Sequence, residues 1–409
     1  MDLPTIEAAF QGNVETRETT AGYKVAVTLV AAVMVLMVAL YLAIVAGTVG
    51  GLIWHATKHL LLVSGPRSGG VIRWLLYLTP IIILLLLIVF LLKPLLARRA
   101  PHERPQPLDP QIEPLLYGFV ARICEATGVP MPACIYLDCS VNASAGFAPA
   151  ASGGPKPELT LTLGLVLLAG LTLQQFAGVV AHEFGHFNQK RTLRFLRWVW
   201  GIHNWIARLA YQPDSWDIYL ANWSDPERTR WETVIVGIAR SGVALVRCLF
   251  KALFHLSAAA SSFLSRQMEL EADRFEYTLA GSAAFEETFR QMRFLQRAAN
   301  RTYEVVRTMY GQSKMLPVNF PAFVLEQETR LDSYVRSRIE ATAAKTRSGL
   351  FDSHPSDAER LRFAREAALP GLVRLPGPAT QLLSNFPALA AYFTSLHYAE
   401  LLRPPDDQG

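Results

Sequence analysis

Two long uncharged runs stand out near the N-terminus of the chain, at residues 25–46 and 74–92. A helix that crosses a membrane needs about 20 consecutive apolar residues, so each run predicts one transmembrane helix. Acidic residues precede the first run, which is also longer than the apolar core of a cleavable signal peptide. We therefore expect an N-terminal membrane hairpin within residues 1–100.

The segment behind the hairpin has a different composition. Residues 101–114 contain five prolines, which is typical of an extended, semi-rigid linker. Residues 115–370 then show the mixed periodicities of a folded domain, and residues 371–409 remain as a C-terminal extension. We expect these four parts to be the domain organisation of the chain.

Within residues 115–370 the pattern predicts a mostly helical α+β fold. Residues 115–127 and 172–190 have the period of amphipathic helices. Residues 133–137 and 158–163 are typical of short strands. The stretch between these strands, 140–157, is rich in Ser, Ala, Gly and Pro and is expected to be a loop.

Residues 193–264 have an unusual composition for a water-soluble domain. Six of the eight tryptophans lie between Trp198 and Trp231, with arginines among them, a combination that suits a membrane interface. Residues 234–264 are largely apolar and hold three Lys or Arg residues. We expect membrane-associated helices here, which are either interfacial or re-entrant, or else fully spanning; a soluble amphipathic pair is the remaining interpretation.

Composition supports a hybrid of membrane and water-facing parts, with 51% hydrophobic and 18% charged residues. The net charge is +5, but no basic cluster is interleaved with aromatic residues, so we expect a lipid bilayer and no nucleic acid as a partner. The four cysteines form no CxxC pair, which predicts reduced thiols. Six Lys and Arg residues flank the hairpin outside and three lie in its loop, so both termini are expected on the cytoplasmic side.

The predicted helix at 172–190 carries the sequence His182-Glu183-Phe184-Gly185-His186. In this H-E-x-x-H pattern the two histidines lie four residues apart on one helical face, so both imidazoles can bind one zinc ion. Glu183 lies beside the metal, where it can act as general base on a water whose pKa zinc lowers to roughly 7. Two surface histidines on an amphipathic helix are the alternative interpretation.

A catalytic zinc ion needs a third protein ligand. No third histidine follows His186 closely, and the best candidate is Glu269, in a stretch expected to be helical. Asp273 lies four residues further on the same face and is expected to hold a ligating histidine by its other ring nitrogen. A solvated acidic face is the alternative for this pair.

These motifs resemble the zinc metallopeptidases of the HtpX type, a family that also includes the CAAX prenyl proteases. Strand-like residues 159–163 run directly into Gly164-Leu165 and then the H-E-x-G-H helix. The other matching features are Asn142-Ala143-Ser144-Ala145-Gly146, the E-x-x-A-D stretch from Glu269 to Asp273, and His354-Pro355 followed by Arg360. The motifs occur in the family's order between residues 115 and 365.

The resemblance implies a gluzincin-like peptidase domain with one catalytic zinc, anchored in a membrane such as the bacterial inner membrane and acting on its cytoplasmic side. Its substrates would be proteins or peptides, in particular misfolded or damaged membrane proteins. His354 is a candidate donor to the oxyanion, although it also precedes a proline at a helix start. Leu161 lies in a strand to which substrate could add, and Asn142 could support that edge or be an ordinary turn residue.

Two rival functions remain open from the sequence. One is a non-proteolytic membrane scaffold or chaperone that retains the fold, against which the intact Glu183 argues. The other is an enzyme like the CAAX prenyl proteases, which have more spanning helices than the sequence shows.

Overall fold

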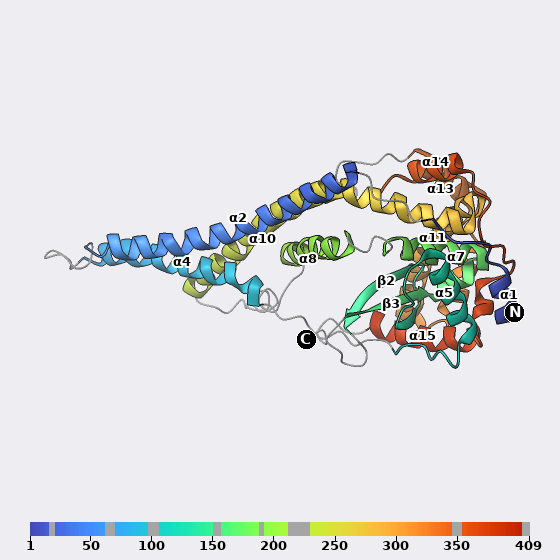
Figure 1. The fold of residues 1–409 in the computed structure, drawn as a ribbon. Coiled ribbons are helices and arrows are strands. Elements are labelled where there is room, and N and C mark those ends of the chain that lie inside the picture. Colours follow the sequence, from blue (N-terminus) through green and yellow to red (C-terminus); the bar gives the residue numbers. More distant parts are fainter. Residues whose placement is uncertain are drawn as a thin grey trace. The chain divides into compact units, whose positions relative to one another are not determined.

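The computed structural model describes residues 1–15, 21–61, 70–96, 106–149, 157–187, 192–211, 230–345 and 354–402. The chain divides into two units, which we describe separately (Figure 1). The sheet unit comprises Met1–Glu18, His102–Lys190 and Ser265–Gly409, and the helical unit comprises Thr19–Pro101 and Arg191–Leu264.

The helical unit consists of long apolar helices. They are α2 (Ala21–Lys58), α4 (Val71–Leu96), α8 (Thr192–Tyr211) and the first part of α10 (Arg230–Ala280). Helices α2 and α4 pack side by side, and the Tyr77 hydroxyl of α4 donates a 3.0 Å hydrogen bond to the Ala56 carbonyl of α2. This pairing forms the predicted N-terminal hairpin.

Three helices in the described part of the chain are long and apolar enough to cross a membrane: Val25–Lys58, Val71–Leu92 and Arg240–Ala259. The first is longer than the predicted span, because the glycines after Ala46 do not end it. In an apolar run the backbone groups find partners only within the helix, which favours its continuation. The third lies within residues 193–264, for which the sequence analysis kept both interfacial and fully spanning helices as alternatives.

The sheet unit is mostly helical around one small sheet. Its strands are β1 (Cys134–Asp138), β2 (Ala143–Pro149) and β3 (Pro157–Gly164). Its helices are α1 (Leu3–Ala8), α5 (Pro114–Thr127), α6 (Leu165–Gly170), α7 (Leu173–Gly185), the end of α10, α11 (Ser282–Ser313), α12 (Phe320–Thr329), α13 (Ser333–Lys345), α14 (Asp357–Ala367), the short 3-10 helix η1 (Ala379–Leu382) and α15 (Phe386–Leu401). The α+β, mostly helical prediction is confirmed.

The sheet has the order β1-β3-β2, with β1 parallel and β2 antiparallel to β3. Two expectations are corrected by this order. Residues 143–149 were expected in a loop, yet they pair with β3 in a register that sets Ala145 opposite Leu161. Leu161 was expected at an open edge, but it is 0% exposed on the central strand, both of whose edges are already paired. The free edge beside the site belongs to β2.

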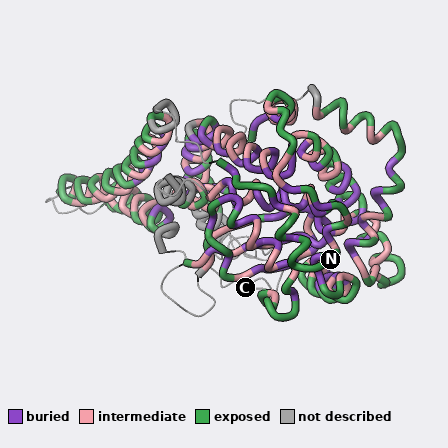
Figure 2. The backbone as a smooth tube through the Cα atoms, turned by 45° about the vertical axis from the view of Figure 1, so that its right-hand side comes forward, coloured by how far each residue is buried: buried purple, intermediate pink, exposed green. Residues whose placement is uncertain are grey.

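Both ends of the described chain join the core of the sheet unit (Figure 2). Ile6 and Phe10 are buried there, and the Gln11 amide donates a 2.7 Å hydrogen bond to the Leu372 carbonyl. Val373 and Phe393 are buried in the same core. Residues 1–15, grouped with the membrane hairpin in the sequence analysis, therefore pack in the sheet unit.

Candidate metal centre

Helix α7 presents the H-E-x-x-H motif at its C-terminal end. The helix begins with a capping box, in which the Thr172 side chain accepts a hydrogen bond from the Gln175 amide at 3.3 Å. Phe176 and Phe184 are buried in the core on one face. The helix ends at Gly185, so that His186 is its C-cap residue; the predicted end at Lys190 lies outside the described residues.

Helix α10 approaches α7 closely enough to bring a carboxylate to the histidines. A Cβ at Gly185 would lie 2.9 Å from the Cα of Ala272, so only a glycine lets the two helices pack at this distance. Ala272 is fully buried at the contact. The small side chain of Ala272 therefore lies where the two helices approach each other closely.

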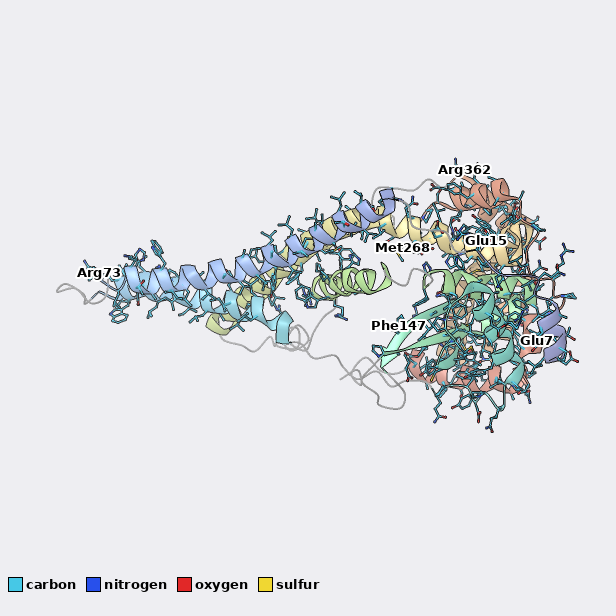
Figure 3. The ribbon with its side chains drawn as sticks, in the orientation of Figure 1. Glu7, Glu15, Arg73, Phe147, Met268 and Arg362 are labelled. Carbon is cyan, nitrogen blue, oxygen red and sulfur yellow. The ribbon has the colours of Figure 1, made fainter. Side chains whose placement is uncertain are left out.

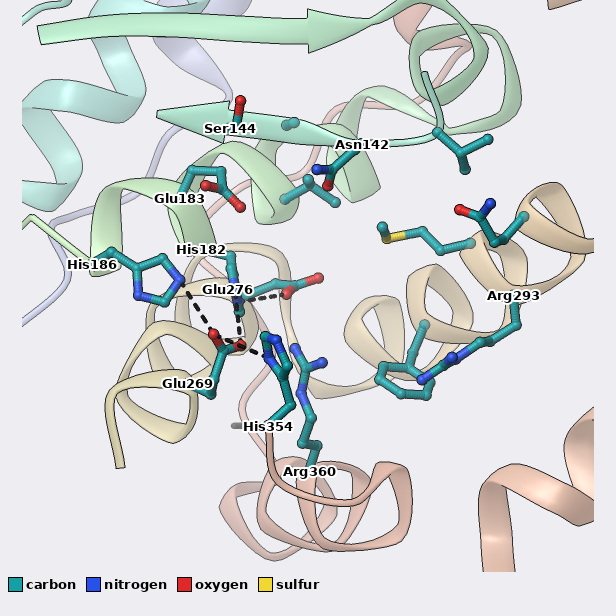
Figure 4. Close-up of a pocket in the computed structure, with 16 residues that line it drawn as sticks. Asn142, Ser144, His182, Glu183, His186, Glu269, Glu276, Arg293, His354 and Arg360 are labelled. Atoms are coloured by element: carbon teal, nitrogen blue, oxygen red, sulfur yellow. Dashed lines mark ion pairs between the residues drawn. The ribbon is translucent and has the colours of Figure 1, made fainter. Parts of the chain in front are cut away.

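His182, His186 and Glu269 converge on one point (Figure 4). The Nε2 atoms of His182 and His186 lie 3.7 Å and 3.8 Å from the two carboxylate oxygens of Glu269. The two imidazole rings are nearly perpendicular, at 87°, and the three ligand atoms lie within 4.8 Å of one another. Two imidazoles and one carboxylate form a donor set that zinc favours, so the residues fit this metal.

The other ring nitrogen of His182 faces buried carboxylates. Its Nδ1 lies 3.2 Å from Oδ1 of Asp273, and Asp273 is 1% exposed. Arg360 of α14 holds Asp273 through two hydrogen bonds, one of them 2.7 Å from Nε to Oδ2. Burial opposes the charge on Asp273, but Arg360 and His182 outweigh it and keep the pKa of this carboxyl below its usual value.

Glu183 lies beside the three ligands, between α7 and β2. Its Oε2 accepts a hydrogen bond of 3.3 Å from the backbone amide of Ala145 on β2. Burial raises the pKa of Glu183 to about 7, although His182 and this amide work in the opposite direction. The sequence did not identify the Ala145 amide, because its position depends on β2 being a strand.

The remaining predicted residues also border this centre, apart from Leu161. The side chain of His354 is 67% exposed, and its Nδ1 lies 3.3 Å from Oε1 of Glu269. Asn142 lines the same cavity just before β2. Its carbonyl accepts a 2.8 Å hydrogen bond from the Gly164 amide, and a Cβ at Gly164 would lie 2.7 Å from that carbonyl oxygen. The Gly164 turn thus needs a glycine.

Glu276 is a site residue that the sequence analysis missed. It is 6% exposed, and its Oε2 lies 3.5 Å from Nδ1 of His182. Glu276 follows Glu269 by seven positions and Asp273 by three, a spacing that places all three residues on one helical face. This spacing is the signal in the sequence that could have identified Glu276.

These side chains surround one cavity of about 410 Å³. Its walls come from β2 and the residues before it, from α7, α10 and α11, and from the start of α14 with the residues before it. In the part of the chain that the structure describes, residues 371–402 contribute nothing to this lining.

The part of the chain that contains this centre matches a known protein family. Residues 119–368, more than half of the chain, match peptidase family M48. No solved structure matches the chain. Peptidases of this family are zinc-dependent metalloendopeptidases, and His182, His186 and Glu269 are a possible site for that metal. The chain therefore belongs to peptidase family M48.

Proposed function

We propose that the protein is a membrane-anchored zinc endopeptidase of the HtpX type, with its catalytic domain on the cytoplasmic side. The convergence of His182, His186 and Glu269 beside Glu183 is the observation that carries this proposal. Misfolded or damaged membrane proteins are the substrates we propose, because the family cuts proteins and the chain has its own candidate membrane helices.

In this proposal His182, His186 and Glu269 hold the zinc ion. When bound there, zinc supplies Lewis-acid polarisation of the scissile carbonyl. The chain's own contribution starts with the rigidity of the ligands: Asp273 orients the His182 ring through Nδ1, and Arg360 fixes Asp273 in turn. Such support keeps Nε2 of His182 aimed toward Glu269.

Glu183 is the proposed general base. A carboxyl with a pKa of about 7 can accept a proton from the attacking water and later deliver it to the amine of the leaving group. The Ala145 amide holds the carboxylate oxygen in place from the opposite side of the cleft. His354, beside Glu269, is the proposed donor to the oxyanion that forms on the former carbonyl oxygen.

The free edge of β2 is the proposed binding place for the substrate backbone. An extended peptide can add to an open strand edge through main-chain hydrogen bonds. Phe147, labelled in Figure 3, is 41% exposed on this strand, and its ring packs 5.6 Å from that of Phe187 after α7. We propose that Asn142 positions the peptide where it enters the cavity.

Two observations favour this function over the rivals. A binding-only metal site needs no base, yet Glu183 is present and held by a backbone amide. Three candidate spans occur in the described ranges, which suits the HtpX type better than the prenyl proteases with their larger number of helices.

The experiment is cleavage of an unfolded model protein in detergent by the full chain and by Glu183→Gln, after zinc has been quantified in both. We expect about one zinc per chain in each protein and a rate about 100- to 10,000-fold lower for the variant. The matched control is Glu271→Gln, on the outer face of α10, which should cleave like the wild type. Equal cleavage by Glu183→Gln would overturn the assigned base, and no cleavage by the zinc-loaded wild type would favour the scaffold.

A further inference from the structure

Three glutamates line the cavity, and hydrolysis accounts for two of them. Glu269 is a proposed zinc ligand and Glu183 the proposed base, whereas Glu276 has no part in either role. Glu276 is nevertheless 6% exposed, and burying an ionisable group without a use for it costs stability. Its surroundings therefore show what it can do.

Glu276 is the less engaged of two carboxylates near His182. Asp273 lies closer to Nδ1 of His182, at 3.2 Å against 3.5 Å, and it alone is held by Arg360. One N–H group serves one acceptor well, and the nearer Asp273 is the better placed of the two carboxylates to orient the imidazole. The second carboxylate oxygen of Glu276 then points into the cavity (Figure 4).

Packing fixes this carboxylate at the cavity wall. Gly178 of α7 lies opposite the stem of Glu276, and a Cβ there would lie 3.1 Å from Cγ of Glu276 and 2.9 Å from Cβ of Ala280. The glycine thus makes room for the glutamate between α7 and α10. A side chain confined in this way presents its charge at low entropic cost.

The other residues that line the cavity leave the negative charge of Glu276 available to a ligand. Val179 and Met292 provide apolar surface in the lining of the same cavity. Both arginines at the cavity are already held by aspartates: Arg360 by Asp273, and Arg293 by Asp357 at 2.5 Å. In the described ranges, His182 is the ion-pair partner that lies within 4 Å of Glu276.

We propose that Glu276 is a specificity-determining residue that selects substrates with Lys or Arg next to the scissile bond. The apolar wall takes the methylene stem of such a side chain, and the carboxylate pairs with its cationic end. This inference rests on the proposed peptidase function, because it names which peptides that function prefers.

The test uses zinc-loaded full-length enzyme in detergent and a set of quenched fluorescent peptides. The peptides differ at one of the two residues flanking the cleaved bond, which is Lys, Arg, norleucine or Glu. We expect wild-type kcat/KM to be about tenfold higher for Lys than for norleucine at one of these positions, and lowest for Glu. In Glu276→Gln the Lys-to-norleucine ratio should fall to about one, with one zinc per chain retained.

Charge reversal and a control on the same helix sharpen the result. Glu276→Lys should favour the Glu peptide over the Lys peptide, whereas Glu271→Gln should keep the wild-type ratio. A wild type that cleaves all peptides equally, or a ratio unchanged in Glu276→Gln, overturns the inference and leaves the peptidase function intact. Loss of zinc from Glu276→Gln would make the residue a positioning residue of His182 instead. No cleavage of any peptide by the wild type would contradict the peptidase function itself.

Discussion

The chain carries two pairs of histidines spaced four residues apart at the C-terminal end of a helix, one in each unit. In the sheet unit, the rings of His182 and His186 are 5.1 Å apart and nearly perpendicular, with both Nε2 atoms aimed at Glu269. In the helical unit, the rings of His55 and His59 are stacked 4.6 Å apart at 25°, and Nε2 of His55 lies 3.2 Å from the Tyr77 carbonyl.

The comparison shows that histidine spacing alone does not make a metal site. Helical geometry brings both pairs to one face. In the part of the chain that the structure describes, only the pair His182 and His186 meets a carboxylate, which comes from a helix more than 80 residues away in sequence. Among the described residues, no group of three potential metal ligands includes His55 or His59. The second helix and its close packing distinguish the two pairs.

The largest effect is expected from removal of one histidine pair, whereas removal of the other pair should have none. His182→Ala combined with His186→Ala should reduce bound zinc from about one per chain to near zero and abolish cleavage, because two of three protein ligands are lost. His55→Ala combined with His59→Ala should retain full zinc and cleavage. Metal analysis of both purified proteins checks this, and zinc loss from the His55/His59 variant would contradict the assignment.

The buried ion pair behind His182 should have the next largest effect. Arg360→Met leaves the charge of Asp273 buried without its partner, and we expect a loss of about 3–5 kcal/mol in the free energy of unfolding. Asp273→Asn should weaken zinc binding about 10- to 100-fold. Pulse proteolysis in a Glu183→Gln background, which prevents self-cleavage, measures the stability.

The control for the pair of Arg360 and Asp273 is Arg362, a surface arginine that lies on α14 like Arg360. Arg362 is 60% exposed by its side chain, and its contact with Glu366 is 3.8 Å long. Arg362→Met should change stability by less than about 1 kcal/mol. Equal losses for Arg360→Met and Arg362→Met would show that the Asp273 pair has no special role.

Leucines in the two units should respond differently to truncation. Leu161 is 0% exposed in the sheet unit, and Leu161→Ala should cost about 2–5 kcal/mol because it leaves a cavity. Leu75 of α4 is 58% exposed, where lipid is as apolar as leucine itself, so Leu75→Ala should cost less than about 0.5 kcal/mol. The same proteolysis assay in detergent compares them, and a large loss for Leu75→Ala would indicate protein packing on that face.

The smallest difference in stability is expected between two glycine-to-alanine substitutions, one in each unit. At Gly164 an added methyl group meets the backbone carbonyls of Ser140 and Asn142, so Gly164→Ala should cost about 1–3 kcal/mol. At Gly47 of α2 nothing lies within 4 Å of an added Cβ, so Gly47→Ala should stabilise the helix by up to about 1 kcal/mol. Thermal unfolding in detergent separates the two, and a destabilised Gly47→Ala would reveal an unrecognised close approach.

The sequence predicted those parts of the molecule that short-range rules determine. Apolar length predicted α2 and α4, and helical periodicity placed His182 and His186 on one face. The motif containing Glu269 and Asp273 could be assigned because both residues lie on one helix. Each of these inferences needs only the geometry of a single helix.

The sequence did not predict features that depend on pairing between distant segments. β2 is built mostly from Ala, Ser and Gly, which have little strand preference, so its pairing with β3 is set by the fold. The misplaced edge at Leu161 follows directly from that missed strand. The packing of residues 1–15 on the core and the confinement of Glu276 by Gly178 likewise appear only when separate elements come together.

The most direct test of the metal centre is a zinc titration of the metal-free full-length protein in detergent. Cleavage of an unfolded model protein and bound zinc are measured in the same samples. We predict that activity is absent without metal, rises in proportion to bound zinc and saturates at about one ion per chain. Full cleavage by the metal-free protein, or no cleavage with one zinc bound at His182, His186 and Glu269, would contradict the zinc peptidase function.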